Sequence, residues 1–126
     1  MTTQTVRSGK GPLQQDCLWR DVFHHVTSRW GILVLIALSG GPLRFYLLRD
    51  EVEGVSEKML SQTLKLLIRD GLVLRSVEPS VPPKVSYELT TMGHGLAARL
   101  SGVSSWIGDH IPDLARARLR FDQPSV

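Results

Sequence analysis

The sequence has one cysteine and no long apolar run. Cys17, alone among 126 residues, cannot form a disulfide within the chain, which fits a reducing compartment. The most apolar run, residues 32–38, is far shorter than the roughly 20 residues that a membrane-spanning helix needs. Residues 1–16 lack the apolar segment of a signal peptide. We therefore expect a soluble, cytoplasmic protein with no membrane partner.

Motifs of known enzyme classes are also missing. The chain has no glycine-rich phosphate loop, no serine nucleophile elbow, and no histidine paired with cysteine or serine in a recognisable catalytic motif. The acids in residues 50–53 form a charge cluster, but such clusters are more often solvated surface than acid–base pairs. We expect the protein not to be an enzyme and to bind no cofactor.

The histidines do not predict a metal site. His24 lies seven residues after Cys17 and would share a helix face with it. A zinc site, however, needs about four ligands, and the adjacent side chain of His25 would point to a different side of the helix. We therefore predict no metal.

Length and charge allow one domain with a modest basic excess. With 42% hydrophobic residues, the chain is long enough to bury one core. We expect residues 1–14 to be a disordered N-terminal arm and residues 15–122 to form a single domain. Net charge is +3, but residues 44–88 carry seven basic and seven acidic side chains. Attraction to a polyanion must therefore come from the arrangement of charges on one face.

Residues 55–73 predict one amphipathic helix around which the other elements are arranged. At about 100° per residue, one side of this helix is an apolar stripe suited to face a core. Ser56 is a suitable N-cap, and Gly71 is a suitable left-handed stop. The stripe consists of Leu60, Leu64, Leu67 and Ile68.

The opposite face of this helix is polar and has no acidic member. Its long donors, amide and hydroxyl suit phosphates and base edges in a DNA major groove. A solvated outer face is the alternative that these residues alone leave open. The members of this face are Lys58, Ser61, Gln62, Lys65 and Arg69.

The flanking segments predict a winged helix. A buried apolar helix ends near Leu38, and a short helix over about residues 46–52 is joined to the central helix by a tight turn, as in a helix-turn-helix. Two β-rich stretches, 72–77 and 85–89, enclose a hairpin tip stiffened by three prolines. We predict an α+β, mainly helical fold: a winged helix-turn-helix with a long C-terminal dimerisation helix.

The helix that follows Thr90 or Thr91 carries an apolar stripe longer than a small core requires. Pro112 should end or kink it, and residues 114–122 should form a short further helix with exposed arginines. Such a stripe needs a partner, so we expect a homodimer. The dimerisation candidates are Leu96, Leu100, Val103, Trp106 and Ile107.

Taken together, these pieces resemble the HxlR-type winged-helix transcriptional regulators, which are related to the MarR group. The similarity extends from residue 17 to about residue 110, with its motifs in the family's order. They are the isolated Cys17, RW at 29–30, GPLRF at 41–45, GVSEKMLSQTL at 54–64, DGLV at 70–73, VPPKVSYELT at 81–90, and Trp106.

The resemblance implies a dimeric, sequence-specific DNA-binding regulator, most often a repressor. The helix over about residues 56–70 would enter the major groove, and the wing at 78–84 would follow the adjacent backbone or minor groove. A two-fold dimer would read a pseudo-palindromic operator with half-sites about 10 bp apart. The DNA-binding residues carried over are Ser56, Lys58, Met59, Ser61 and Gln62, with Lys65 and Arg69 nearer phosphates, and Pro83 and Lys84 on the wing.

Two signals for such a regulator stay open. In several family members a cysteine at the position of Cys17 senses oxidants or electrophiles, and a helix N-terminus favours the reactive thiolate. A lone cysteine is otherwise often a small, half-buried apolar residue. The other candidate signal is an apolar or quinone-like small molecule bound between the first helix, expected over residues 16–26, and the last helix, which follows Thr90 or Thr91.

One departure from the family and one rival function complete the expectations. Tyr46 and Leu47 stand where the family has a small polar residue and Glu, so the third helix lacks its usual cap and either exposes or buries extra apolar surface. A winged helix can also serve as a dimerisation or protein-docking module without specific DNA binding. The absence of aromatic anchors from the polar face disfavours that alternative.

Overall fold

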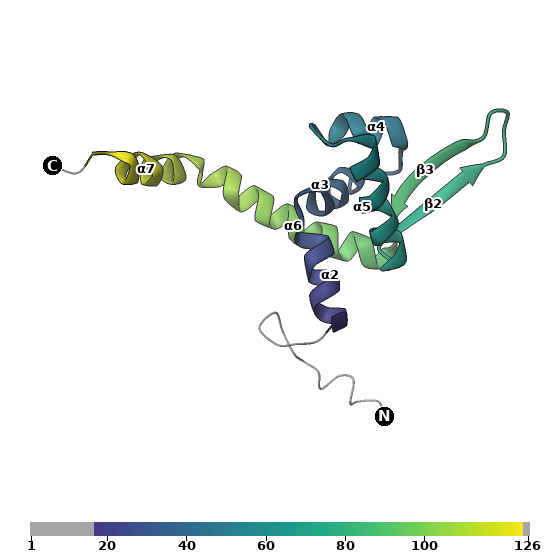
Figure 1. The fold of residues 1–126 in the computed structure, drawn as a ribbon, viewed down its shortest axis with the longest axis horizontal. Coiled ribbons are helices and arrows are strands. Elements are labelled where there is room, and N and C mark those ends of the chain that lie inside the picture. The colour runs from purple at the N-terminus through teal and green to yellow at the C-terminus, as the bar shows by residue number, and fades with distance from the viewer. Residues whose placement is uncertain (1–16, 125–126) are drawn as a thin grey trace, which may run out of the picture.

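The computed structural model describes residues 17–124, which are mainly helical with one small sheet (Figure 1). In chain order the elements are α2 (Cys17–Thr27), α3 (Arg29–Leu38), β1 (Leu43–Arg44), α4 (Phe45–Glu51), α5 (Glu57–Arg69), β2 (Val73–Glu78), β3 (Lys84–Leu89), α6 (Thr91–Asp109) and α7 (Ile111–Asp122). The predicted fold class, a winged helix-turn-helix with a long C-terminal helix, is confirmed. The expected disordered arm, residues 1–14, lies outside the described residues.

Helix α3 is the centre of the core. Val34, Leu35 and Leu38 are completely buried, and α3 contacts α2, α4, α5, α6 and β3. The helix starts at Ser28, whose hydroxyl accepts a hydrogen bond from the backbone N–H of Gly31 at 3.2 Å. The nearly continuous apolar sequence of this helix thus reflects contact with other elements on almost every side.

Helices α4 and α5 form the helix-turn-helix, and α5 is oriented by its apolar stripe. Leu60, Leu64 and Leu67 are buried, as the helical spacing predicts, and Ile68 is half-buried. The predicted N-cap is confirmed, because the hydroxyl of Ser56 accepts a hydrogen bond from the N–H of Met59 at 3.1 Å. The opposite side of α5 is consequently turned to solvent.

Gly71 ends α5 in the way that the sequence predicts. Its φ of +76° lies in the left-handed region, which L-residues with a side chain rarely adopt. The turn returns the chain through Leu72, whose N–H bonds the carbonyl of Leu67 at 3.0 Å, directly into β2. The end of α5 and the start of the wing are therefore one continuous, hydrogen-bonded corner.

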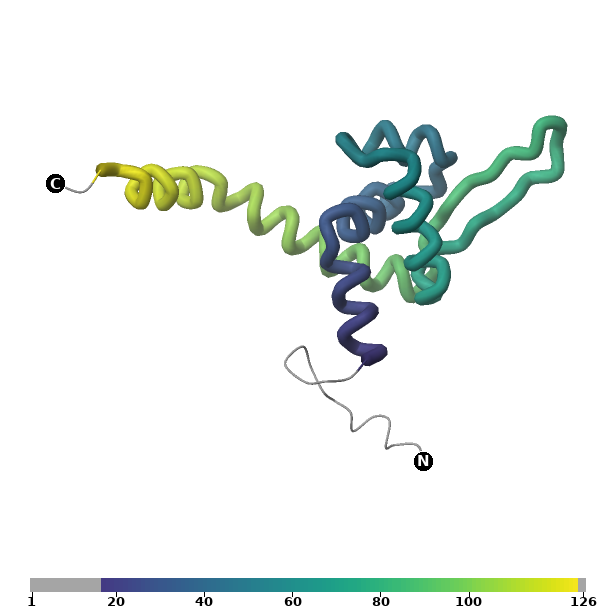
Figure 2. The backbone as a smooth tube through the Cα atoms, in the orientation of Figure 1, coloured from purple at the N-terminus to yellow at the C-terminus, as the bar shows by residue number. Residues whose placement is uncertain are grey.

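The wing is the antiparallel hairpin of β2 and β3. It pairs from Val73 opposite Leu89 to Glu78 opposite Lys84, and β1 pairs with the other edge of β3, which gives the order β1-β3-β2. Only Val73 and Leu89, at the base, are buried within the two long strands. The tip therefore projects away from the body (Figure 2).

Helix α6 belongs to the body at its start and leaves it near its middle. Its N-cap Thr90 accepts a hydrogen bond from the N–H of Gly93 and donates one to the carbonyl of Gly71, which fixes α6 to the corner after α5. Residues 102–109 and the whole of α7 are exposed, and they extend from the body as an arm (Figure 2). Pro112 lies in the first turn of α7, so it accompanies a helix end rather than a kink.

The third helix, α4, lacks a side-chain cap. Its N-cap residue Arg44 makes no capping hydrogen bond, and Tyr46 and Leu47 are exposed. The departure noted in the sequence therefore adds apolar surface to the outside of the protein. No helix within residues 17–124 is long and apolar enough to cross a membrane.

We predict that Leu35→Ala lowers the free energy of unfolding by about 2–5 kcal/mol, because it leaves a cavity in a completely buried site. Leu33→Ala, on the exposed side of the same helix, is the matched control and should cost less than about 1 kcal/mol. Urea unfolding at one fixed protein concentration measures both. Equal losses in the two variants would contradict the central position of this face of α3.

Candidate nucleic-acid interface

The polar face of α5 is exposed along its whole length. Every side chain that the sequence proposes for DNA contact on this helix is accessible to solvent, and none is acidic. These side chains are Ser56, Lys58, Met59, Ser61, Gln62, Lys65 and Arg69. The buried stripe on the other side leaves them free to contact a partner outside the protein.

An ion pair closes the turn between α4 and α5. Nη1 of Arg49 lies 2.5 Å from Oε2 of Glu57. Both side chains are exposed, so the pair contributes little to stability. Its effect is local: the one acidic side chain in the first turn of α5 is turned toward α4 and neutralised. No local sequence pattern indicates this pairing among the several acids nearby.

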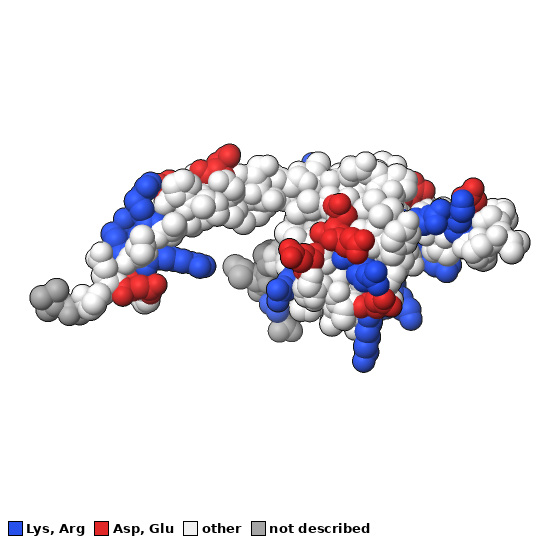
Figure 3. All heavy atoms as spheres, turned by 90° about the horizontal axis from the view of Figure 1, so that it is seen from above, with Lys and Arg blue, Asp and Glu red and all other residues white. Residues whose placement is uncertain are grey.

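The wing carries the other predicted contacts at its tip. Pro83 and Lys84 are both exposed, and Lys84 lies opposite Glu78 in the hairpin. Seen from above, basic side chains lie on the wing, along the lower edge of the body and on the arm, and acidic side chains lie over the middle of the body as well as on the wing and the arm (Figure 3). The acid-free surface is therefore the outer face of α5 and not a whole side of the molecule.

Two hollows flank α5 on the side of α2. The first, of about 180 Å³, lies between the α2–α3 corner and α5, and Met59 and Gln62 line it together with His24 and Trp30. The second, of about 560 Å³, lies between α2, the end of α5 and the start of α6. Its apolar lining residues are Leu18, Val22, Leu72, Met92 and Leu96. This second hollow is where the sequence expectation placed a small effector.

Cys17 is the first residue of α2, and its side chain is exposed. No other cysteine occurs in the sequence, so an oxidised form would need a second chain, a small thiol or an oxygen adduct. Within residues 17–124 no group of three or more His, Cys, Asp or Glu side chains is placed to hold a metal.

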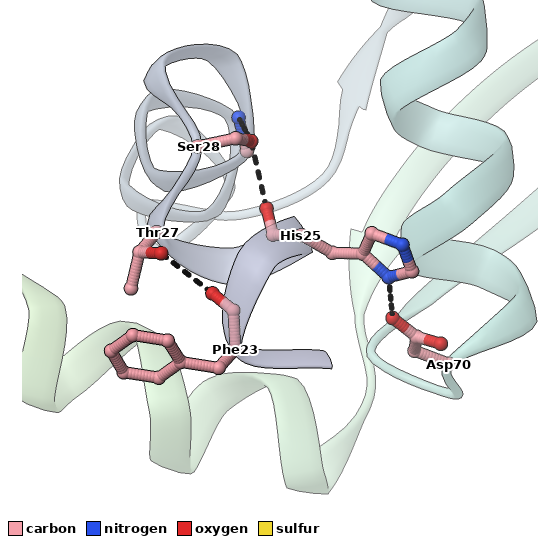
Figure 4. Close-up of polar contacts among 6 residues, drawn as sticks. Phe23, His25, Thr27, Ser28 and Asp70 are labelled. Atoms are coloured by element: carbon pink, nitrogen blue, oxygen red, sulfur yellow. Dashed lines mark hydrogen bonds and ion pairs between the residues drawn. The ribbon is translucent and has the colours of Figure 1, made fainter. Parts of the chain in front are cut away.

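His25 has a partner that sequence reasoning missed. Its Nδ1 lies 2.7 Å from Oδ2 of Asp70, the C-cap residue of α5 (Figure 4). The two residues are 45 positions apart, and no local pattern connects them. The sequence indicates only that His24 and His25, as neighbours on a helix, point in different directions.

The predicted dimerisation residues divide into two groups. Leu96 and Leu100 pack against the chain's own core. Val103, Trp106 and Ile107 are exposed, with 55% of Trp106 accessible to solvent. The apolar surface continues onto α7, where the exposed members are Ile111, Leu114, Leu119 and Phe121. A single chain leaves this surface uncovered.

Comparison with known proteins supports the interpretation of this fold as a helix-turn-helix regulator. The model of the HxlR-like helix-turn-helix family matches residues 25–115. The chain belongs to this family. The HTH-type transcriptional regulator YtfH of Escherichia coli K12 is 43% identical over 104 residues, 82% of each chain. The structure of the transcriptional regulator ytfH from Salmonella typhimurium has a TM-score of 0.74 and 44% identity, covering 79% of this chain and 88% of that one.

A third similar protein is YodB from Bacillus subtilis, in a diamide-treated crystal structure. It shares 32% identity over 76% of this chain and 96% of YodB, with a TM-score of 0.64. As a member of the HxlR-like family, the chain is a DNA-binding transcriptional regulator of the helix-turn-helix type. Its relatives are transcriptional regulators, not members of an enzyme family.

Proposed function

We propose that this HxlR-like chain is a homodimeric repressor that occupies a pseudo-palindromic operator through α5 and the wing. The observation that carries the proposal is the exposed, acid-free face of α5, directly opposite a buried stripe. A helix held in this way presents one fixed set of donors to a major groove. Residues 15–122 act in this proposal as one domain.

Within α5 we assign base reading to the centre of the exposed face. Gln62 can pair bidentately with adenine, and Lys58 can reach guanine acceptors. Ser56, Met59 and Ser61 lie beside them on the same exposed surface. Lys65 and Arg69, nearer the C-terminal end, are suited to phosphates because their long side chains reach past the groove edge.

The wing supplies the second contact in this proposal. Pro83 and Lys84 lie at the exposed end of a hairpin whose base is fixed in the core. A basic residue at a projecting tip adds phosphate contacts without reading bases. Three prolines in the tip limit the conformations that the loop loses on binding.

A second copy of the chain is the proposed partner for the arm. The exposed apolar side chains of residues 103–121 are continuous from α6 to α7, and α2 adds Leu18 and Phe23. Their number exceeds the scattered apolar residues expected on a monomer. A two-fold pairing through these helices would place two α5 helices about one helical turn of DNA apart.

The signal that releases DNA is proposed to act on α2. One route is modification of the exposed Cys17 at its first residue, and the diamide-treated form of the relative YodB supports this route. The other is a small apolar ligand in the hollow between α2, α5 and α6. Either signal must favour one spacing of the recognition helices by about 5 kcal/mol to move occupancy from nearly full to nearly empty.

Selection of DNA from a random pool, at two salt concentrations and with or without oxidant, tests the proposal. We expect an enriched pseudo-palindrome with nanomolar affinity, and sedimentation at twice the 14.0 kDa of the chain. Loss of binding on oxidation that Cys17→Ser abolishes would select the thiol route. Weak, salt-sensitive binding without an enriched sequence would instead favour the protein-docking module.

Gln62→Ala should weaken binding to the selected operator by about 1–3 kcal/mol and relax preference at one base position, because one bidentate contact is lost. Gln123→Ala, a change of the same residue type at an exposed position beyond α7, should leave affinity unchanged. Fluorescence anisotropy with operator variants measures both effects. An equal loss of affinity for all DNA sequences would show that Gln62 does not read a base.

Lys84→Ala should weaken binding to operator and unrelated DNA alike and reduce the slope of log affinity against log salt by about one, because one phosphate contact is removed. Arg116→Ala removes the same charge from α7 and should leave the slope unchanged. Titrations at four or more salt concentrations give the slopes. An unchanged slope for Lys84→Ala would remove the wing tip from the interface.

A further inference from the structure

The His25–Asp70 pair is a polar bridge between α2 and the end of α5. With 15% and 10% of their side chains accessible, both partners are shielded from water. The other ion pairs within residues 17–124 involve Arg49 or Arg116 and are much more exposed. A hydrogen bond to a carboxylate is stronger when water is excluded, so this bridge contributes more to geometry than the surface pairs do.

The Asp70 end of the bridge is fixed to the recognition helix. Asp70 is the C-cap of α5, and its N–H bonds the carbonyl of Leu66 at 3.0 Å. The next residue, Gly71, is bonded to the carbonyl of Ile68 at 3.0 Å and leads into the wing. A movement of the Asp70 carboxylate would therefore move α5 and the base of the wing together.

The His25 end is fixed equally well to the α2–α3 corner. The carbonyl of His25 accepts a hydrogen bond from the hydroxyl of Ser28 at 2.9 Å. A Cβ atom at Gly31 would lie 2.0 Å from that carbonyl oxygen, so only glycine allows α3 to approach this closely. Figure 4 shows this contact between the His25 carbonyl and Ser28, which holds the backbone of His25 against the start of α3.

The bridge lies between the two hollows that flank α5. His25 lines both hollows beside α5: Gln62 lines the first with it, and Asp70 and Arg69 line the second. Both helices also pack against α3, which sets their orientation indirectly. The bridge adds a direct polar connection between α2 and the end of α5.

We propose that His25 and Asp70 are positioning residues for DNA recognition, which set the orientation of α5 relative to α2. The inference rests on the proposed function, in which α2 takes part in dimer contact and α5 reads DNA. Because α2 contacts the partner chain in this proposal, a fixed angle between α2 and α5 also fixes the distance between the two α5 helices of the dimer. The bridge therefore determines which spacing of half-sites the protein accepts.

The test measures affinity for a series of operators whose half-sites are moved apart or together by one and two base pairs. We expect the wild-type protein to prefer one spacing by about tenfold or more, as a rigid dimer must. His25→Ala and Asp70→Ala should reduce this preference to less than about threefold, singly and together, because either one breaks the same contact. Thermal unfolding is measured in parallel.

Two controls and one replacement variant separate positioning from stability. His24→Ala alters the exposed neighbour on α2 and should keep the wild-type spacing preference. Asp70→Asn keeps an oxygen acceptor for the imidazole N–H and should retain most of the preference. Asp70→Leu keeps the bulk of the side chain and removes the acceptor, and it replaces Asp70→Ala if that variant does not fold.

The outcomes are distinguishable. A weaker preference for one half-site spacing in His25→Ala and Asp70→Ala, whatever their melting temperatures, supports the positioning role. A loss of affinity by the same factor at every spacing, or an unchanged preference, would show that the bridge only stabilises the fold. If the wild-type protein selects no operator at all, the proposed function fails and the positioning role fails with it.

Discussion

Burial of one side of α5 against α3 is the constraint on which the rest of the structure depends. Leu60, Leu64 and Leu67 can be buried together at only one rotation of the helix about its axis. That rotation also decides which side chains face outward. The composition of the outer face is then a direct consequence of core packing, and a change that rotated α5 by one residue would exchange donors for leucines.

Much of this arrangement could be predicted from the sequence because its signals are local. The caps Ser56 and Thr90 bond N–H groups only three residues away, and Gly71 marks a stop within one turn of the helix it ends. The β-rich stretches on either side of a proline-rich tip are equally local signals. Periodicity and caps therefore predicted the elements, and the short connections between them predicted the winged helix.

Other features could not be predicted because they join distant parts of the chain. Nothing near His25 indicates that Asp70 lies beside it, since their contact exists only after α2, α3 and α5 have packed together. The apolar stripe of α6 had a similar ambiguity. Its spacing continues from Leu100, which completes the chain's own core, to Ile107, which lies beyond it. Periodicity shows which face is apolar, but not what covers it.

The arm and the His25–Asp70 bridge both affect how a signal at α2 can reach DNA. Helix α7 has 12 residues and no buried side chain, and a helix of about that length is only marginally stable in water without packing. The proposed homodimer supplies a surface that covers this helix. With α2 and the arm held by a second chain in that proposal, a change at α2 moves α5 through rigid connections. The hydrogen-bonded corner at Asp70 and Gly71 supplies such a connection to α5 and the wing, the two elements proposed to contact DNA.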